Sequence, residues 1–112
     1  MSKGSEELLE LVKEVFPHQK IELEYNIAER GALFLDIYIP ALKVAFEFDG
    51  EQHFRFCEHF HDTRENFIAA KKRDVKKDIR CDELGITLIR VAYNETMSKE
   101  LLLKKLEGEW NE

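Results

Sequence analysis

The chain has 112 residues, of which 44% are hydrophobic, and its formal net charge at neutral pH is −6. This length predicts one domain over residues 1–112, and the negative charge excludes nucleic-acid binding by bulk electrostatic attraction. We expect no membrane segment, secretory leader or lipid anchor, and the two separate cysteines indicate a reducing compartment, the cytoplasm.

A helix and a strand are predicted first. Apolar residues at helical spacing run from Leu8 to Phe16 and stop before Pro17, with acidic residues at the positive end of the helix dipole. Residues 20–27 alternate between apolar and polar types, which predicts a strand with one buried face. The apolar members of that face are Ile21, Leu23, Tyr25 and Ile27. Gly31 can then supply the positive φ of a hairpin turn.

Two apolar, β-rich runs follow at residues 33–39 and 42–48, separated by Pro40 and closed by Asp49 and Gly50. Together with the preceding strand they predict an antiparallel meander. Residues 51–62 show no clear period and contain aromatic and histidine side chains. We expect a surface loop there, the kind of segment that often carries function on a rigid scaffold.

The remaining residues predict a helix, a strand and a helix. The long helix spans residues 63–84 and is capped by Gly85, residues 86–92 form a strand that pairs in parallel, and residues 98–110 form the last helix. We expect the long helix to turn Ile68, Val75 and Ile79 inward and its lysines and arginines outward, and the last helix to bury Leu102, Leu103, Leu106 and Trp110. The order αβββαβα predicts an α/β fold, a mixed sheet flanked by helices.

The segment 71–80 is basic although the chain is acidic. Its six basic residues outnumber its two aspartates, for a local charge of +4. Such a run is commonly a solvated helix face with ion pairs.

Acidic residues occupy two of the predicted apolar strands. Successive strand residues point to opposite faces, so Glu47 and Asp49 share a face that Phe48 does not, and Asp36 on the neighbouring strand can meet them. Converging carboxylates repel unless a cation lies among them, and oxygen ligands of this kind suit Mg²⁺ or Mn²⁺. The alternatives are that Asp49 is a turn former before Gly50 and that Glu47 faces solvent.

The loop offers two further hypotheses. Sulfur and imidazole ligands would suit zinc, and the candidates are Cys57, His59 and His61 with His53 or Cys81. The aromatic residues Phe54, Phe56 and Phe60 would either stack on a base or close over the core.

Four motifs in order give the chain a family resemblance. They are FLDIYIP at residues 34–40, VAFEFDGEQHF at 44–54, RDVKKD at 73–78 and LGITLIRVAY at 84–93. In this order the segment from Tyr25 to Tyr93 resembles the PD-(D/E)XK nuclease superfamily, in the branch of the very-short-patch repair endonucleases and related phage homing endonucleases. The resemblance implies a restriction-endonuclease-like core and a metal-dependent nuclease.

The resemblance also implies residue roles. Asp36 and Glu47 would bind Mg²⁺ or Mn²⁺ with the main-chain carbonyl of Phe48, and His53 would lie near the attacking water or the scissile phosphate. Further catalytic candidates are Asp74 and Lys77 on one face of the long helix and Glu6, or nearly as well Glu7, on the first helix.

Two positions depart from the family pattern. The proline that usually precedes the aspartate is Leu35, and the lysine expected two residues after the glutamate is Asp49. The missing lysine normally orients the water and balances charge. Either Lys77 takes over from the helix, or His53 transfers the proton, for which an imidazole is suited by its pKa.

The sequence thus predicts a metal-dependent DNA endonuclease in which a metal-activated water attacks the phosphodiester. Its predicted DNA contacts are Lys71, Lys72, Arg73, Lys76, Arg80, Gln52 and Phe54. A homodimer or a protein partner would supply sequence specificity, because so small a chain has little surface for reading a long site. The rival hypotheses are a non-catalytic nucleic-acid-binding domain with a degenerate nuclease fold and a protein-interaction domain.

Overall fold

The computed structural model describes residues 1–55 and 63–110 and has the predicted order of elements. These are α1 (Lys3–Val15), β1 (Glu22–Asn26), β2 (Phe34–Ile39), β3 (Val44–Asp49), the short 3₁₀ helix η1 (Glu51–His53), α3 (Arg64–Leu84), β4 (Thr87–Ala92) and α4 (Lys99–Trp110). The predicted loop after β3 therefore begins with a helical turn, and residues 56–62 lie outside the described part of the chain. No helix in the described ranges is long and apolar enough to cross a membrane.

The four strands form one mixed sheet in the order β1-β2-β3-β4. The first three pair antiparallel, and β4 pairs in parallel with β3 after the crossover through α3. Both the predicted meander and the predicted parallel strand are confirmed. The fold is α/β, with helices on both faces of the sheet.

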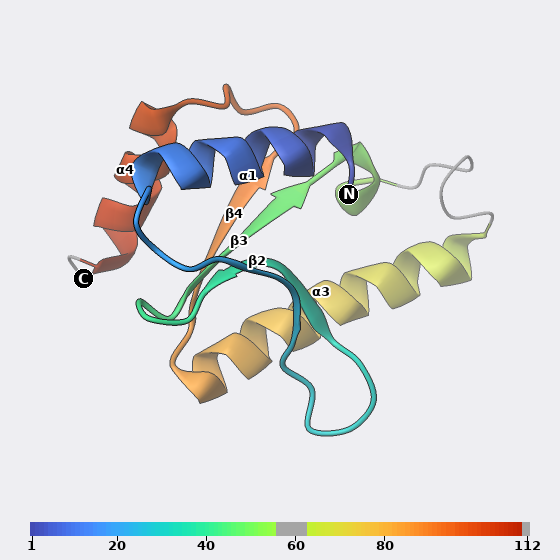
Figure 1. Ribbon diagram of the computed structural model, residues 1–112. Helices are drawn as coiled ribbons and strands as arrows, with labels where there is room; N and C mark the ends of the chain where they lie inside the picture. The colour runs from blue at the N-terminus through green and yellow to red at the C-terminus, as the bar shows by residue number, and fades with distance from the viewer. Residues whose placement is uncertain (56–62, 111–112) are drawn as a thin grey trace.

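The helices divide between the two faces, as Figure 1 shows: α1 and α4 cover one face, and α3 crosses the other. The α1/α4 layer packs Leu8, Val12, Leu102 and Leu106 on the sheet residues that point toward it, Phe46 among them. A smaller apolar cluster forms under α3, around its buried Cys81. The larger hydrophobic core thus lies on the α1/α4 side, and the α3 side has room for polar side chains.

Helix α3 begins and ends as its sequence predicts. The Thr63 hydroxyl accepts a hydrogen bond from the Asn66 backbone N–H at the N-terminus, and Gly85 adopts φ 71° at the C-terminus. A residue with a Cβ is strained in this left-handed conformation, which explains the glycine.

The predicted inward face of α3 is wrong. Ile68, Val75 and Ile79 are 52%, 55% and 57% exposed, so the apolar stripe of the helix faces solvent. The face toward the sheet carries Phe67, Ala70, Asp74, Lys77, Cys81 and Leu84. Because the sheet surface beneath this helix carries charged side chains, the helix meets it with charges of its own.

Two smaller predictions about burial also fail. On β1, Leu23 and Tyr25 are 49% and 38% exposed, because this is an edge strand and Glu24, at φ 49°, interrupts its regular geometry. On α4, Leu102 and Leu106 are buried as expected, but Leu103 is exposed on the outer side of the helix.

Candidate active site

Asp36 and Glu47 meet on the sheet face that α3 covers. The pairing of β2 with β3 joins Ile37 to Phe46, so the next positions in register are Asp36 and Glu47. The two carboxyl groups are within hydrogen-bonding reach. Glu47 is 3% exposed, which rules out the alternative that it is a solvent-facing residue of an alternating strand.

The opposite face of the same strand is apolar. Phe48 packs with the core under α1, and its ring lies so close to Gly4 that a Cβ there would approach ring carbons to 2.3 Å. The predicted alternation of Glu47 and Phe48 is therefore confirmed. The N-terminal turn of α1 lies beside the residue that follows Glu47. Glu6 and Glu7 in that turn are exposed.

Lys77 reaches from α3 to the carboxylate pair. Its Nζ donates a hydrogen bond of 2.6 Å to Oε1 of Glu47, and the two side chains are only 17% and 4% exposed. The prediction that the lysines of this helix point outward is therefore wrong at this position. A charged lysine is brought under the helix because a buried carboxylate requires a compensating group.

The carboxylate pair has an unusual protonation equilibrium. Burial, and then the hydrogen bond and negative charge of Asp36, raise the pKa of Glu47 to about 8, against the opposing influence of Lys77. Near neutral pH, in the absence of a metal, Glu47 therefore retains its proton to a large extent. A divalent cation can replace this proton, because it stabilises the ionised forms of both groups.

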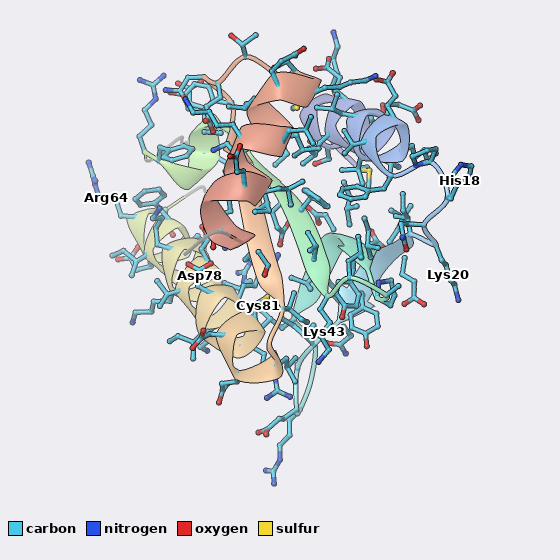
Figure 2. The ribbon with its side chains drawn as sticks, turned by 90° about the vertical axis from the view of Figure 1, so that its left-hand side faces the viewer. His18, Lys20, Lys43, Arg64, Asp78 and Cys81 are labelled. Carbon is cyan, nitrogen blue, oxygen red and sulfur yellow. The ribbon has the colours of Figure 1, made fainter. Side chains whose placement is uncertain are left out.

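Asp49 is part of a second charged cluster. Its Oδ1 accepts a hydrogen bond of 3.0 Å from Nη1 of Arg90, whose Nη2 donates to Oδ1 of Asp78 at 3.0 Å and to the carbonyl oxygen of Asp74 at 3.3 Å. Figure 2 shows Asp78 and Cys81 on α3, where the helix passes over the sheet. The guanidinium thus fastens α3 to β3 and β4 next to Lys77.

Arg90 was missed by the sequence analysis. It stands between Ile89 and Val91 in an apolar strand, and its Cα is the register partner of Glu47. The sequence signal for Arg90 is the same as that for Glu47, namely a charged residue within an apolar strand.

The remaining catalytic and loop candidates are placed only in part. The backbone of His53 ends η1, and the position of its side chain lies outside the described part of the structure. Gln52 folds over Gly50, and Phe54 is 52% exposed beside Tyr93 with ring centroids 5.7 Å apart. Of the zinc candidates, Cys57, His59 and His61 lie in the undescribed segment, as do the aromatic candidates Phe56 and Phe60.

The predicted DNA contacts on α3 line two neighbouring hollows. Lys71 and Lys72 border the solvent-facing apolar stripe, and Lys71 lies 5.8 Å from the centre of the Phe54 ring. Arg73 lies toward the β1–β2 loop, and Lys76 borders both hollows. Arg80 is held by that loop, because its Nε donates a hydrogen bond of 2.7 Å to the carbonyl oxygen of Ile27.

The donors near Glu47 suit a hard cation. Within residues 1–55 and 63–110, no group of three or more histidine, cysteine, aspartate or glutamate side chains is placed to hold a metal. Two carboxylates and a backbone carbonyl are nevertheless a donor set for Mg²⁺ or Mn²⁺, which retain several waters. Asp49 is engaged by Arg90 and is the weaker of the predicted ligands.

No family model matches the chain. It is similar to "Uncharacterized protein 307L" of Invertebrate iridescent virus 6, with 37% identity over 67% of this chain and 38% of that protein. It is also similar to "Uncharacterized protein 094L" of Frog virus 3, with 41% identity over 55% of this chain and 41% of that protein. A third relative is "Uncharacterized protein 033L" of Invertebrate iridescent virus 3, with 30% identity over 74% of this chain and 43% of that protein. The chain thus spans about two fifths of the length of these viral relatives.

Proposed function

We propose that the protein is a metal-dependent DNA endonuclease with a restriction-endonuclease-like core. The observation that carries the proposal is the meeting of Asp36, Glu47 and Lys77 on one face of the sheet, with the lysine 2.6 Å from Glu47. Two carboxylates and a lysine are the groups that the PD-(D/E)XK resemblance implies. Here the lysine comes from α3, and the position two residues after the glutamate is Asp49.

The metal ligands would be the carboxylates of Asp36 and Glu47 with the carbonyl of Phe48. When bound, Mg²⁺ or Mn²⁺ supplies Lewis-acid polarisation of the phosphate and lowers the pKa of the attacking water. The protein's own contribution is to hold the two carboxylates together in a site where water is largely excluded, since Glu47 is buried. Such a preorganised site needs little rearrangement when negative charge develops on the phosphate in the transition state.

Lys77 would serve as the charge-balancing group of the site. Its ammonium carries three N–H donors, and Glu47 needs one of them. The others are free to orient the attacking water or to stabilise the negative charge that develops on the phosphate. His53 remains the alternative for proton transfer, as the resemblance implies.

Arg90 would act as a positioning residue. It binds Asp49 on β3 and both Asp78 and the carbonyl of Asp74 on α3. These contacts lie on both sides of Lys77 along the helix and two residues beyond Glu47 along the strand. The guanidinium therefore fixes the distance between Lys77 and Glu47. Catalysis requires that its groups be held in a fixed geometry.

Cleavage of supercoiled plasmid tests the proposal. We expect the wild type to convert it to nicked or linear DNA with Mg²⁺ or Mn²⁺ and to be inactive in EDTA. Asp36→Asn and Lys77→Met should each lower the rate by about 100-fold or more, the usual effect of losing a group that stabilises developing charge. Lys104→Met on α4 removes the same charge from an exposed site and should leave the rate unchanged.

Circular dichroism of each variant establishes that it is folded. An intact plasmid with folded wild type overturns the nuclease proposal. If that protein still binds DNA with an affinity that falls steeply with salt, the non-catalytic nucleic-acid-binding hypothesis takes its place.

A further inference from the structure

A groove of about 540 Å³ lies between α3 and the loop that joins β1 to β2. The loop is fixed by Asn26, whose Oδ1 accepts from the backbone N–H groups of Ala28 and Leu33 and whose Nδ2 donates to the carbonyl of Gly31. Gly31 adopts φ 75°, which lets the loop turn sharply. One wall of the groove is therefore a preformed loop, and the other is a long helix.

Arg80 ties the two walls together and lies near both acids of the groove. Its Nε donates to the carbonyl oxygen of Ile27, and its Nη1 lies 3.7 Å from a carboxylate oxygen of Glu29 and 3.9 Å from one of Glu83. One guanidinium thus offsets one of the two negative charges that line the groove.

Three further cations line the same groove. They are Arg30 on the loop and Arg73 and Lys76 on α3. In residues 1–55 and 63–110, none of the three has a carboxylate within ion-pairing distance. The groove therefore presents an uncompensated positive charge in a chain that is acidic as a whole.

The groove is formed by residues that neighbour the carboxylate site along the chain. Lys76 directly precedes Lys77, and Arg73 lies one helical turn before Lys77 on the adjoining side of the helix. On the other wall, Leu33 of the groove stands three residues before Asp36. An anion chain lying in the groove would thus run along the β1–β2 side of α3, beside the elements that carry Asp36 and Lys77.

We infer that this groove binds the phosphodiester backbone of the DNA strand beside the phosphate to be cut, through Arg30, Arg73 and Lys76. This inference rests on the proposed function and identifies the surface along which the DNA substrate would lie. The apolar side chains of the groove, Leu33 and Ile79 among them, suit the carbons of the sugars. Lys71 and Lys72 line the neighbouring surface around Ile68 and Val75 and are not among the residues of this groove.

The test is binding of a fluorescently labelled DNA duplex in EDTA, by anisotropy over a range of salt concentrations. Arg30→Gln, Arg73→Gln and Lys76→Gln should each weaken binding about 3- to 10-fold and lower the slope of log affinity against log salt by about 1. Lys72→Gln and Lys104→Gln, which remove equal charges outside the groove, should change the affinity less than about twofold.

DNA binding tests the groove, and plasmid cleavage tests the nuclease proposal, so the two can fail separately. If groove variants weaken binding selectively while wild type cuts no plasmid with Mg²⁺ or Mn²⁺, the groove stands and the nuclease proposal fails. Binding that falls equally with Lys72→Gln, or that no groove variant changes, overturns the groove even if wild type cuts DNA. Absence of DNA binding by the folded wild type at low salt also overturns it.

Discussion

Glu47 is a carboxyl group on a buried strand, hydrogen-bonded to a lysine at 2.6 Å and in contact with a second carboxyl group. A buried Lys–Glu pair alone would be a structural feature of limited energetic value, because desolvation offsets its attraction. The second acid changes the situation. When Glu47 is ionised, Asp36 adds a second negative charge that one lysine does not compensate, and a cation that replaces the proton of Glu47 would balance this charge.

The raised pKa of Glu47 has a consequence for stability. A carboxyl group that binds its proton more tightly in the folded chain stabilises the fold below its unfolded pKa, and this contribution is lost as the pH rises through the folded pKa. For Glu47 the window runs from the ordinary value of 4.5 to about 8. In EDTA, we expect the free energy of unfolding of the wild type to fall relative to that of Glu47→Gln by up to about 1.4 kcal/mol per pH unit across this window.

Urea denaturation of both proteins at intervals from pH 5 to pH 8 measures this difference. Glu47→Gln keeps the size and a hydrogen-bonding group at the site but cannot ionise. Parallel stability curves for the two proteins would show that Glu47 is ionised throughout and would contradict its raised pKa.

Residue-level chemistry was predictable in part. Asp36 and Glu47 were found from their positions in apolar strands, and Lys77 from the family resemblance. Arg90 was not found, although it interrupts an apolar strand in the same way. Its role depends on which face of β4 meets α3, and this is fixed by the packing of the neighbouring Ile89 and Val91 under α1 and α4.

Among the elements, α3 shows why sequence periodicity predicted the ends of a helix better than its face. Its caps depend on local residues, Thr63 and Gly85, and were predicted correctly. Its apolar stripe was assigned to the core, whereas the structure turns it to solvent. The orientation is set by long-range partners, since Glu47, Asp49 and Arg90 on the sheet require charged groups from the helix above them.

The orientation of α3 can be checked by paired substitutions. Ile79 is 57% exposed and Ile89 is 2% exposed. Ile79→Ala should change the free energy of unfolding by less than about 1 kcal/mol, whereas Ile89→Ala should cost about 2–5 kcal/mol through the cavity it leaves. Chemical denaturation measures both. An equal, large loss in the two variants would mean that α3 buries the stripe that its sequence pattern suggested.

At the scale of the whole molecule, charge is distributed unevenly. The chain carries a net charge of −6, yet the four cations and two carboxylates that line the groove leave it with a net charge of 4 − 2 = +2. The predicted basic segment was therefore only partly useful: Arg73 and Lys76 face the groove, Arg80 supports its wall, and Arg30 comes from a distant loop. Such a surface could not be derived from one run of sequence, because the fold assembles it from two.

The most direct measurement of the central claim, that Asp36 and Glu47 form a divalent-metal site, is a Mn²⁺ titration at neutral pH followed by electron paramagnetic resonance of the free ion. We expect a single Mn²⁺ bound per wild-type chain, with binding lost in Asp36→Asn and in Glu47→Gln and retained in Glu100→Gln, which removes an exposed acid from α4. Folded wild type that binds no Mn²⁺ at millimolar concentration, or a Glu47→Gln variant that binds it as well as wild type, would show that the two carboxylates do not form a metal site.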